Sequence, residues 1–281
     1  MRDAITKFGQ SLIQHGHHND RIYVMKLSNH DVPDIARRLY DMALANKYSK
    51  IFVKVPTIAL ETFMKAGYDV EAYVPGFYNG REDGYFVAKY LDGSRKMEKR
   101  HNVLARALSK ASSTTERCKA AIIHGGPFKV EEASPVDAPE IASLYGKIFS
   151  THPFPVNDPD YLRFSMGRNL KYYFIRSDDR VVSASSLMLD HESGNAEMTD
   201  FATAPKYQGH GLSKRLLQKM EEDVKKEGLK MAYTIARATS YPINRVFSNS
   251  GYSYGGTLTN NTNICGSYES MNVWYKALSA N

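Results

Sequence analysis

The sequence is poor in cysteine and has neither a secretion-type start nor a long hydrophobic run. Its only cysteines, Cys118 and Cys265, are far apart and form no metal-binding or redox motif. A chain without a disulfide framework is typical of a reducing compartment. The first residues, MRDAITKFGQ, lack the apolar segment of a signal peptide, and no run approaches the ~20 apolar residues of a membrane span. We therefore expect a cytoplasmic protein with no membrane partner.

The net charge of +7 is confined to the first part of the chain. Residues 1–125 contain 20 Lys and Arg against 13 Asp and Glu, whereas 126–281 contain 17 of each. Within the first part, 92–119 holds 8 basic and 3 acidic residues. Such a patch can attract nucleic acid, but no recognition motif accompanies it. We interpret 92–127 as a basic helical linker and expect no nucleic-acid partner.

Histidines cluster near the N-terminus, at His15, His17 and His18. Clustered histidines can bind a metal ion. No cysteine or carboxylate ligand pattern lies nearby, so we interpret the segment as a polar turn and expect no metal.

A strand, a glycine-rich turn and a helix follow one another from Asn195 to Gly228. The turn reads Gln208-Gly209-His210-Gly211-Leu212-Ser213, and apolar residues recur at helical spacing after it. Small residues let the backbone approach a ligand, and a helix start offers unpaired N–H groups with the positive end of the helix dipole. Successive amides of this kind form a pocket for phosphate. The turn lacks G-x-G-x-x-G and GK[ST], so neither a dinucleotide fold nor a Walker loop is indicated.

This turn resembles the acyl-CoA signature of the GCN5-related N-acetyltransferases, Q/R-x-x-G-x-G/A. Gln208 and Gly211 match the signature, and Ser213 replaces its last small residue. Pro205-Lys206-Tyr207 is similar to the Pro-x-Tyr that precedes it in that family. The resemblance covers about 128–281 and implies an α/β fold with a mixed sheet, with acetyl-CoA as co-substrate.

The resemblance also implies which residues contact the co-substrate. The turn would hold the pyrophosphate, the end of the preceding strand would pair with the pantetheine arm, and an amide there would meet the thioester carbonyl. The implied contacts are Phe201, Ala202, Thr203, Gln208, Gly209, His210, Gly211, Leu212, Ser213, Asn244 and Phe247. Phe247 stands where the family often has a tyrosine acid, so the thiolate's proton must come from another source. Tyr241, Tyr252, Tyr254, water and the new ammonium remain open.

Acetylation of an amine requires a proton acceptor, because a lysine-like ammonium has a pKa near ~10.4 and carries no free electron pair at neutral pH. Glu197 is the candidate base, at a position that resembles the family's glutamate on the strand before the turn. In an unbroken strand Asp200 would point to the opposite face, which a bulge could change. The alternative for Glu197 is an edge carboxylate that faces water.

A narrower resemblance, to the β-lysine N6-acetyltransferases, rests on IQHGHHNDRIYVMKL, HPFPVNDPDYL, DFATAPKYQGHGL and NICGSYESMNVWYK. Those enzymes act with lysine 2,3-aminomutase to make the osmolyte Nε-acetyl-β-lysine. The resemblance implies that this chain acetylates β-lysine, with 150–166 and 259–270 shaping the pocket. Candidate carboxylate clamps are Arg163, Arg168, Arg237 and Arg245, and candidate amine partners are Asp158, Asp160 and Glu269. The alternatives are another amine (a polyamine, an aminoglycoside or a protein lysine) and a non-catalytic CoA sensor.

The first half of the chain repeats patterns of the second half. FMKAGY (63–68) matches FSNSGY (247–252), and FVAKYL (86–91) matches VWYKAL (273–278). We hypothesise that 1–91 is an α/β domain resembling a degenerate acetyltransferase half, without the glycine turn, ahead of the acetyltransferase domain at 128–281. The alternative is that both segments are generic α/β strings. A homodimer is a further option that the sequence leaves open.

Overall fold

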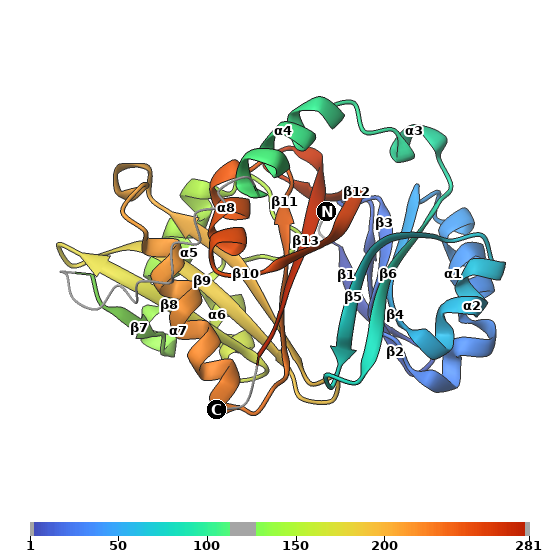
Figure 1. The fold of residues 1–281 in the computed structure, drawn as a ribbon, viewed down its shortest axis with the longest axis horizontal. Helices are drawn as coiled ribbons and strands as arrows, with labels where there is room; N and C mark the ends of the chain where they lie inside the picture. Colours follow the sequence, from blue (N-terminus) through green and yellow to red (C-terminus); the bar gives the residue numbers. More distant parts are fainter. Residues whose placement is uncertain (1–2, 113–127, 279–281) are drawn as a thin grey trace.

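The computed structural model describes residues 3–112 and 128–278. These residues form one 13-stranded sheet, in the order β1-β2-β3-β4-β6-β5-β12-β13-β11-β10-β9-β8-β7 (Figure 1). Only the pairs β3–β4 and β10–β11 are parallel in the described sheet. The predicted α/β class with a mixed sheet is confirmed.

The first half contains β1 (Ala4–Phe8), β2 (Ser11–Gly16), β3 (Arg21–Lys26), η1 (Asn29–Asp31), α1 (Val32–Ala45), β4 (Lys50–Pro56), α2 (Thr57–Lys65), β5 (Asp69–Tyr78) and β6 (Glu82–Tyr90), followed by α3 (Gly93–Lys96) and α4 (His101–Ser112). The second half contains β7 (Val130–Glu132), η2 (Pro135–Asp137), α5 (Ala138–Ile148), α6 (Pro159–Met166), β8 (Leu170–Ser177), β9 (Arg180–Asp190), β10 (Asn195–Thr203), η3 (Pro205–Tyr207), α7 (Leu212–Lys226), β11 (Met231–Arg237), α8 (Tyr241–Asn249), β12 (Ser253–Ile264) and β13 (Ser267–Ala277).

Both halves use the same element order. Three antiparallel strands lead into a helix, a parallel strand, a second helix and a hairpin, as β1-β2-β3-α1-β4-α2-β5-β6 and again as β8-β9-β10-α7-β11-α8-β12-β13. The strand orders are mirror images, so the last hairpins meet at β5 and β12 in the middle of the sheet. The first half therefore continues the sheet of the second half and covers what would otherwise be its open edge.

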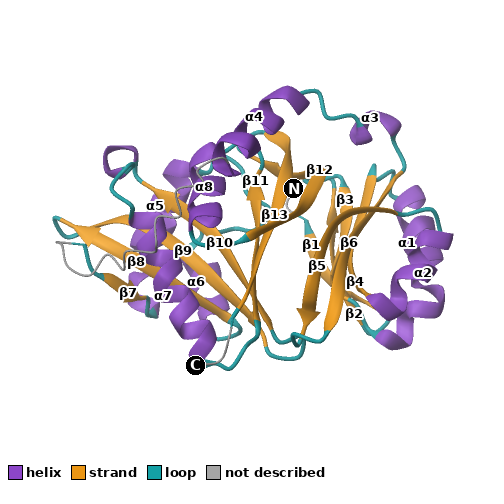
Figure 2. Cartoon of the chain, viewed as in Figure 1, coloured by secondary structure: helices purple, strands orange, loops and turns teal. Residues whose placement is uncertain are grey.

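Helices α1 and α2 cover one face of the first half-sheet, whereas the second half-sheet has α7 and α8 on one face and α5 and α6 on the other (Figure 2). In the first half, Ile35 and Leu39 of α1 pack on alternate residues of β4 such as Ile51 and Val53. In the second half, Leu216 and Met220 of α7 belong to the core with Ala196 and Met198 of β10. The period of 3.6 in the helices and of 2 in the strands explains why these residues share one layer.

The two half-sheets pack against each other through the parts of their faces that these helices leave uncovered, on β3 and β4 in the first half and on β11 and β13 in the second. Tyr23 and Phe52 of the first half share a buried cluster with Tyr233, Met271 and Val273 of the second. The meeting strands approach closely, because a Cβ on Gly256 would lie 2.2 Å from the Glu71 carbonyl oxygen. Glycine at this position, with φ at +146°, allows the contact.

Some predicted element boundaries are wrong. The polar turn expected around the histidines is a turn only at 17–20, and two strands that were not predicted, β1 and β2, precede it at 4–16. The segment 259–270, expected to shape the substrate pocket, is largely strand, and so is 75–84, because each hairpin closes through a tight turn. The described part of the helical linker expected at 92–127 contains α3 and α4, and α4 packs against α8. Residues 113–127, with Cys118, lie outside the described residues.

No helix among the described residues is long and apolar enough to cross a membrane.

Candidate functional site

The parallel strands β10 and β11 separate at the predicted site. They pair at only three positions, the last of which is Glu197 opposite Tyr233. Beyond this pair β10 follows β9, and β11 follows β13. The facing edges of the two strands therefore present backbone groups that have no ladder partner across the gap in this described part of the sheet. Such edges can bind an extended ligand through main-chain hydrogen bonds.

The glycine turn lies between the end of β10 and the start of α7. Gly209 and Gly211 have φ values of +82° and +73°, in the left-handed region that favours glycine. A Cβ on Gly209 would meet nothing within 4 Å, so the space beside it is open. No side chain caps the first amides of α7, which begins at Leu212. The turn and the helix dipole thus form a site suited to an anion such as a phosphate.

The remaining turn residues attach this loop to the end of β10. The Gln208 side chain donates to the carbonyl of Thr203 at 3.4 Å, and the Ser213 hydroxyl lies 3.4 Å from the Thr203 hydroxyl. His210 Nδ1 lies 3.1 Å from the Gln208 carbonyl, and Leu212 is buried in the core. The loop geometry is therefore fixed from several sides.

Glu197 lies at the point where the two strands separate and faces the first half. Tyr233 donates a hydrogen bond to its carboxylate at 3.0 Å, and Lys54 of β4 donates to the Tyr233 oxygen, also at 3.0 Å. Burial raises the pKa of Glu197, while the positive charge of Lys54 and the hydrogen bond from Tyr233 oppose that rise. The arrangement is a largely buried carboxylate with a pKa above its usual range, as a proton acceptor near neutral pH requires.

A bulge in β10 changes the direction of Asp200. The register with β9 shifts between Thr199 and Ala202, and Asp200 has φ at +56°. The Asp200 carboxylate accepts a hydrogen bond from Ser186 at 2.6 Å and lies 3.1 Å from His152 Nε2. Burial opposes its ionisation, but the hydrogen bonds from His152 and Ser186 keep the pKa of Asp200 below its usual value. Asp200 therefore holds the segment between α5 and α6 in place, which leaves Glu197 as the less engaged carboxylate.

The three residues predicted to meet the pantetheine arm lie at the end of β10, beside the turn. The Ala202 carbonyl accepts a hydrogen bond from Ser183 at 3.1 Å. The Thr203 hydroxyl lies 2.8 Å from that of Ser183. Phe201 packs edge-to-face on Phe247, with ring centroids 5.6 Å apart. Phe201, Ala202 and Thr203 thus lie next to the glycine turn. Their role as contacts of the cofactor stays a prediction.

Asn244 and Phe247, both on α8, are buried. The Asn244 amide donates to the carbonyls of Arg237 and Ser240, and its oxygen accepts from Asn272 and Trp274, at 2.8–2.9 Å. All four hydrogen-bonding positions of this side chain are thus used within the protein. A contact from Asn244 to the cofactor arm would involve its backbone or a rearrangement.

The tyrosines considered as proton donors have different surroundings. Tyr241 lies on the surface, where Arg245 donates to its hydroxyl at 2.6 Å. Tyr252 is buried beside Phe247, and burial raises its pKa well above the usual value. Tyr254 on β12 is partly exposed and lies 2.5 Å from the Thr257 hydroxyl. The structure does not single out one of them.

Four of the predicted substrate-binding charges have partners within the protein. Arg163 pairs with Asp160 on exposed α6, and Arg245 bonds to Tyr241. Glu269 is buried and pairs with Arg100 at 2.9 Å. These side chains therefore already have partners within the protein.

Lys54 and Tyr233 are functional candidates that the sequence reasoning missed. The signal in the sequence was the pattern KIFVKV, in which Lys50 and Lys54 share a face with Phe52 in an otherwise apolar strand. A lysine pattern inside a buried strand is costly without partners, so it marks a polar site.

No group of three or more His, Cys, Asp and Glu side chains that could hold a metal converges within residues 3–112 and 128–278. Of the three N-terminal histidines, His15 lies 3.1 Å from the Tyr48 hydroxyl, and the His17 ring packs on that of Tyr48.

The sequence profile of the acetyltransferase (GNAT) family matches residues 139–252. A β-lysine N(6)-acetyltransferase of Methanococcus maripaludis is 39% identical over 98% of this chain and 98% of that protein. The N-acetyltransferase YodP of Bacillus subtilis is 32% identical over 95% and 96%, respectively. A β-lysine N(6)-acetyltransferase of Methanosarcina mazei is 28% identical over 87% and 97%.

Solved structures give a weaker likeness. A protein from Salmonella typhimurium, whose structure holds its cofactor acetyl-CoA, covers 56% of this chain and 96% of its own, at 13% identity and a TM-score of 0.47.

Proposed function

The chain belongs to the acetyltransferase (GNAT) family, and from that premise we propose that it transfers the acetyl group of acetyl-CoA to the side-chain amine of β-lysine. The observation that carries the proposal is the open glycine turn beside the gap between β10 and β11. The largely buried carboxylate of Glu197 lies where these two strands separate. The two relatives named as β-lysine acetyltransferases support the substrate, since one of them matches nearly the whole chain.

The residues of the turn fit the diphosphate of acetyl-CoA. Gly209 and Gly211 adopt the left-handed backbone that aims successive amides outward, and the space beside Gly209 is open. The uncapped start of α7 adds its dipole. When bound, acetyl-CoA supplies the acetyl group as a thioester. The edge of β10 from Phe201 to Thr203 would hold the pantetheine arm, and a backbone N–H there would stabilise the oxyanion.

Glu197 would take the proton from the amine nitrogen. Its raised pKa brings its proton affinity closer to that of an amine, while the charge of Lys54 and the hydrogen bond from Tyr233 favour its carboxylate form. Asp200 is a poorer candidate, since His152 and Ser186 already hold its carboxylate. The proton accepted by Glu197 can then pass to solvent or to the departing thiolate, which Phe247 cannot protonate.

Release of free thiol tests the proposal. Purified protein is incubated with acetyl-CoA and a panel of β-lysine, α-lysine, spermidine, an aminoglycoside and a lysine-containing peptide. We expect the highest kcat/KM for β-lysine, with acetylation at N6 by mass spectrometry. Faster turnover of another amine would replace the substrate, and binding of acetyl-CoA without turnover of any amine would indicate a sensor.

A further inference from the structure

The two half-sheets enclose an interior that is not wholly apolar. Tyr23 and Phe52 stack on neighbouring strands of the first half, with ring centroids 4.9 Å apart, and face the second half. Lys54 lies beyond one end of this aromatic floor and Arg21 beyond the other. The Lys54 ammonium is 5.6 Å and the Arg21 guanidinium 5.3 Å from the centroid of the Tyr23 ring. The floor is thus bounded by two cations.

Arg21 is a buried cation without a counterion. It is 4% exposed, and one of its terminal nitrogens donates to the Asn261 carbonyl and, at 3.1 Å, to the Thr262 hydroxyl. It forms no ion pair with a carboxylate among the described residues, and its Nε–H has no acceptor there. A buried guanidinium is costly unless an anion compensates it, and its fork of donors matches a carboxylate.

Two buried amide oxygens without a donor lie on strands near Arg21, one on the adjacent strand β2 and one on β12. Gln14 is 2% exposed, lies opposite Tyr23 across β2 and β3, and has no partner for Oε1 in the described structure. Asn261 is 1% exposed, its carbonyl is bound by Arg21, and its Oδ1 is likewise unpaired. Buried amide oxygens without donors are rare in folded proteins, and an ammonium group is a donor of the kind that such oxygens lack.

This polar group is linked to the proposed acetylation site by the aromatic floor. From Arg21 the row runs over Tyr23 to Lys54, then through Tyr233 to Glu197, with 3.0 Å at each of the last two contacts. Gln14 also donates to the carbonyl of Pro153 at 3.0 Å, next to the His152 that holds Asp200. The interior therefore offers a carboxylate-and-ammonium site at one end and a proton acceptor at the other.

We propose that Arg21, Gln14 and Asn261 bind the amino-acid head of the substrate, Arg21 its carboxylate and the two amide oxygens its ammonium group, while the distal amine lies at Glu197. The inference rests on the proposed function and identifies the residues that make the enzyme prefer an amino acid over a simple diamine. It also assigns substrate selection to the first half, from which Gln14 and Arg21 come.

The competing explanation is that Arg21 only joins β3 to β12. A specificity ratio separates the two explanations, because it does not depend on the fraction of folded enzyme. We would measure kcat/KM for β-lysine and for its carboxamide, which keeps both amines and lacks the carboxylate charge. The wild-type protein should prefer β-lysine, and Arg21→Met should reduce that preference by about 100-fold. Arg21→Lys keeps the charge without the fork, so its preference should be intermediate.

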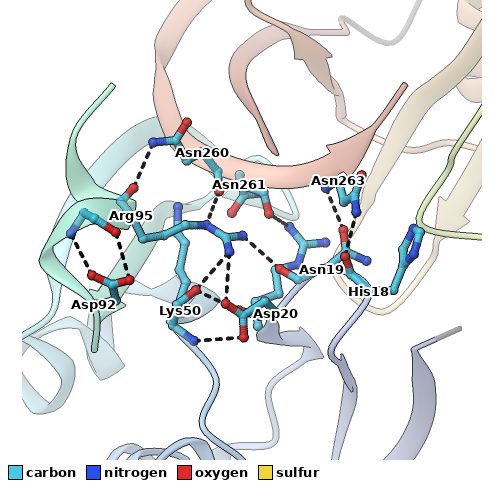
Figure 3. Close-up of polar contacts among 12 residues, drawn as sticks. His18, Asn19, Asp20, Lys50, Asp92, Arg95, Asn260, Asn261 and Asn263 are labelled. Carbon is cyan, nitrogen blue, oxygen red and sulfur yellow. Dashed lines mark hydrogen bonds and ion pairs between the residues drawn. The ribbon is translucent and has the colours of Figure 1, made fainter. Parts of the chain in front are cut away.

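Arg95→Met is the matched control. Arg95 is also buried between the halves, at 5% exposure, but it bonds to Ser49, Asn19 and Asn260 and lies 3.5 Å from Asp20 (Figure 3). Its loss should lower stability and leave the β-lysine to carboxamide ratio unchanged.

Gln14→Leu gives an independent test of the ammonium site. It should lower kcat/KM for β-lysine relative to 6-aminohexanoate, which has a carboxylate and a distal amine but no second amine. A wild-type ratio retained by both Arg21→Met and Gln14→Leu would overturn the head-group site. A wild-type enzyme that acetylates only amines without a carboxylate would instead overturn the proposed function, and with it the need for such a site.

Discussion

The two halves of the molecule share one topology but differ where the parallel strand meets its helix. In the second half, β10 leads through Gly209 and Gly211 into an uncapped helix start. In the first half, β3 leads through η1 into α1, and the Asp31 carboxylate at that junction accepts hydrogen bonds from the amides of Gln10 and Ser11 at 2.9 and 2.7 Å. The turn between β1 and β2 therefore occupies the first-half junction.

Several details make the first-half junction unsuitable for an anion. Asp31 places a negative charge at the start of α1, and Pro33 removes one amide from its first turn. Gly9 packs so closely that an added Cβ would lie 2.2 Å from the Asp31 carboxylate. The same fold can therefore bind a ligand or only cover a neighbouring half-sheet, depending on whether the start of one helix is left open.

Elsewhere the halves have kept equivalent packing. Phe63 and Tyr68 pack edge-to-face at 5.1 Å, and Phe247 and Tyr252 do so at 5.0 Å. In each case the tyrosine amide donates to the phenylalanine carbonyl at 3.1 Å. These contacts close the second helix of each half onto its hairpin, so the shared sequence pattern reflects shared packing.

Removal of the first half should have the largest effect. A chain that starts at Phe128 would expose the inner face around Tyr233 and Val273 and the edge of β12, which the first half now covers. We expect aggregation or loss of a cooperative thermal transition, measured by circular dichroism and size-exclusion chromatography. A soluble fragment that melts cooperatively and keeps the amine selectivity would show that the first half is an independent appendage.

A negative charge at each junction tests the difference between them directly. Gly211→Glu should abolish acetyl-CoA binding, a loss of more than about 100-fold in affinity, because the carboxylate and the strained backbone oppose the diphosphate. Asn29→Glu is the matched control at the exposed first-half junction and should change nothing. Calorimetry should give one acetyl-CoA per wild-type chain. Two per chain, or equal losses in both variants, would contradict the comparison.

The sequence predicted the glycine turn and the element order because both depend on local patterns. The bulge at Asp200 was only an option, since its φ of +56° is imposed by contacts with His152 and Ser186 that lie far away in sequence. The lysines of KIFVKV indicate a polar site in a buried strand, but the partners of Lys54 and Arg21 could not be predicted, because they come together only when the two half-sheets face each other. The strands at 4–16 were missed because β1 is mostly exposed and neither β1 nor β2 alternates between apolar and polar residues.

Replacement of the proposed base should reduce the rate in a pH-dependent way. We expect Glu197→Gln to lower kcat by about 10²–10⁴-fold near neutral pH. The deficit should shrink as pH rises, because more amine then arrives already deprotonated. The measurement is a pH–rate profile of thiol release, with the exposed Glu192→Gln as control. A deficit of the same size at every pH would assign Glu197 to positioning rather than to proton transfer.

The smallest effect tests whether the first half tunes that base. The charge of Lys54 and the hydrogen bond from Tyr233 both lower the pKa of Glu197 against the rise caused by burial. Lys54→Met and Tyr233→Phe should each raise the pKa, so more of the carboxyl is protonated near neutral pH. The acid limb of the pH profile of kcat/KM should therefore move to higher pH, and further for Lys54→Met than for Tyr233→Phe. At a pH on that limb, kcat/KM should fall on the order of ten-fold.

Above the limb both variants should approach the wild-type rate. A shift to lower pH would show that Lys54 does not act on Glu197 electrostatically, and an unshifted limb with a uniform loss would make Lys54 a substrate contact instead.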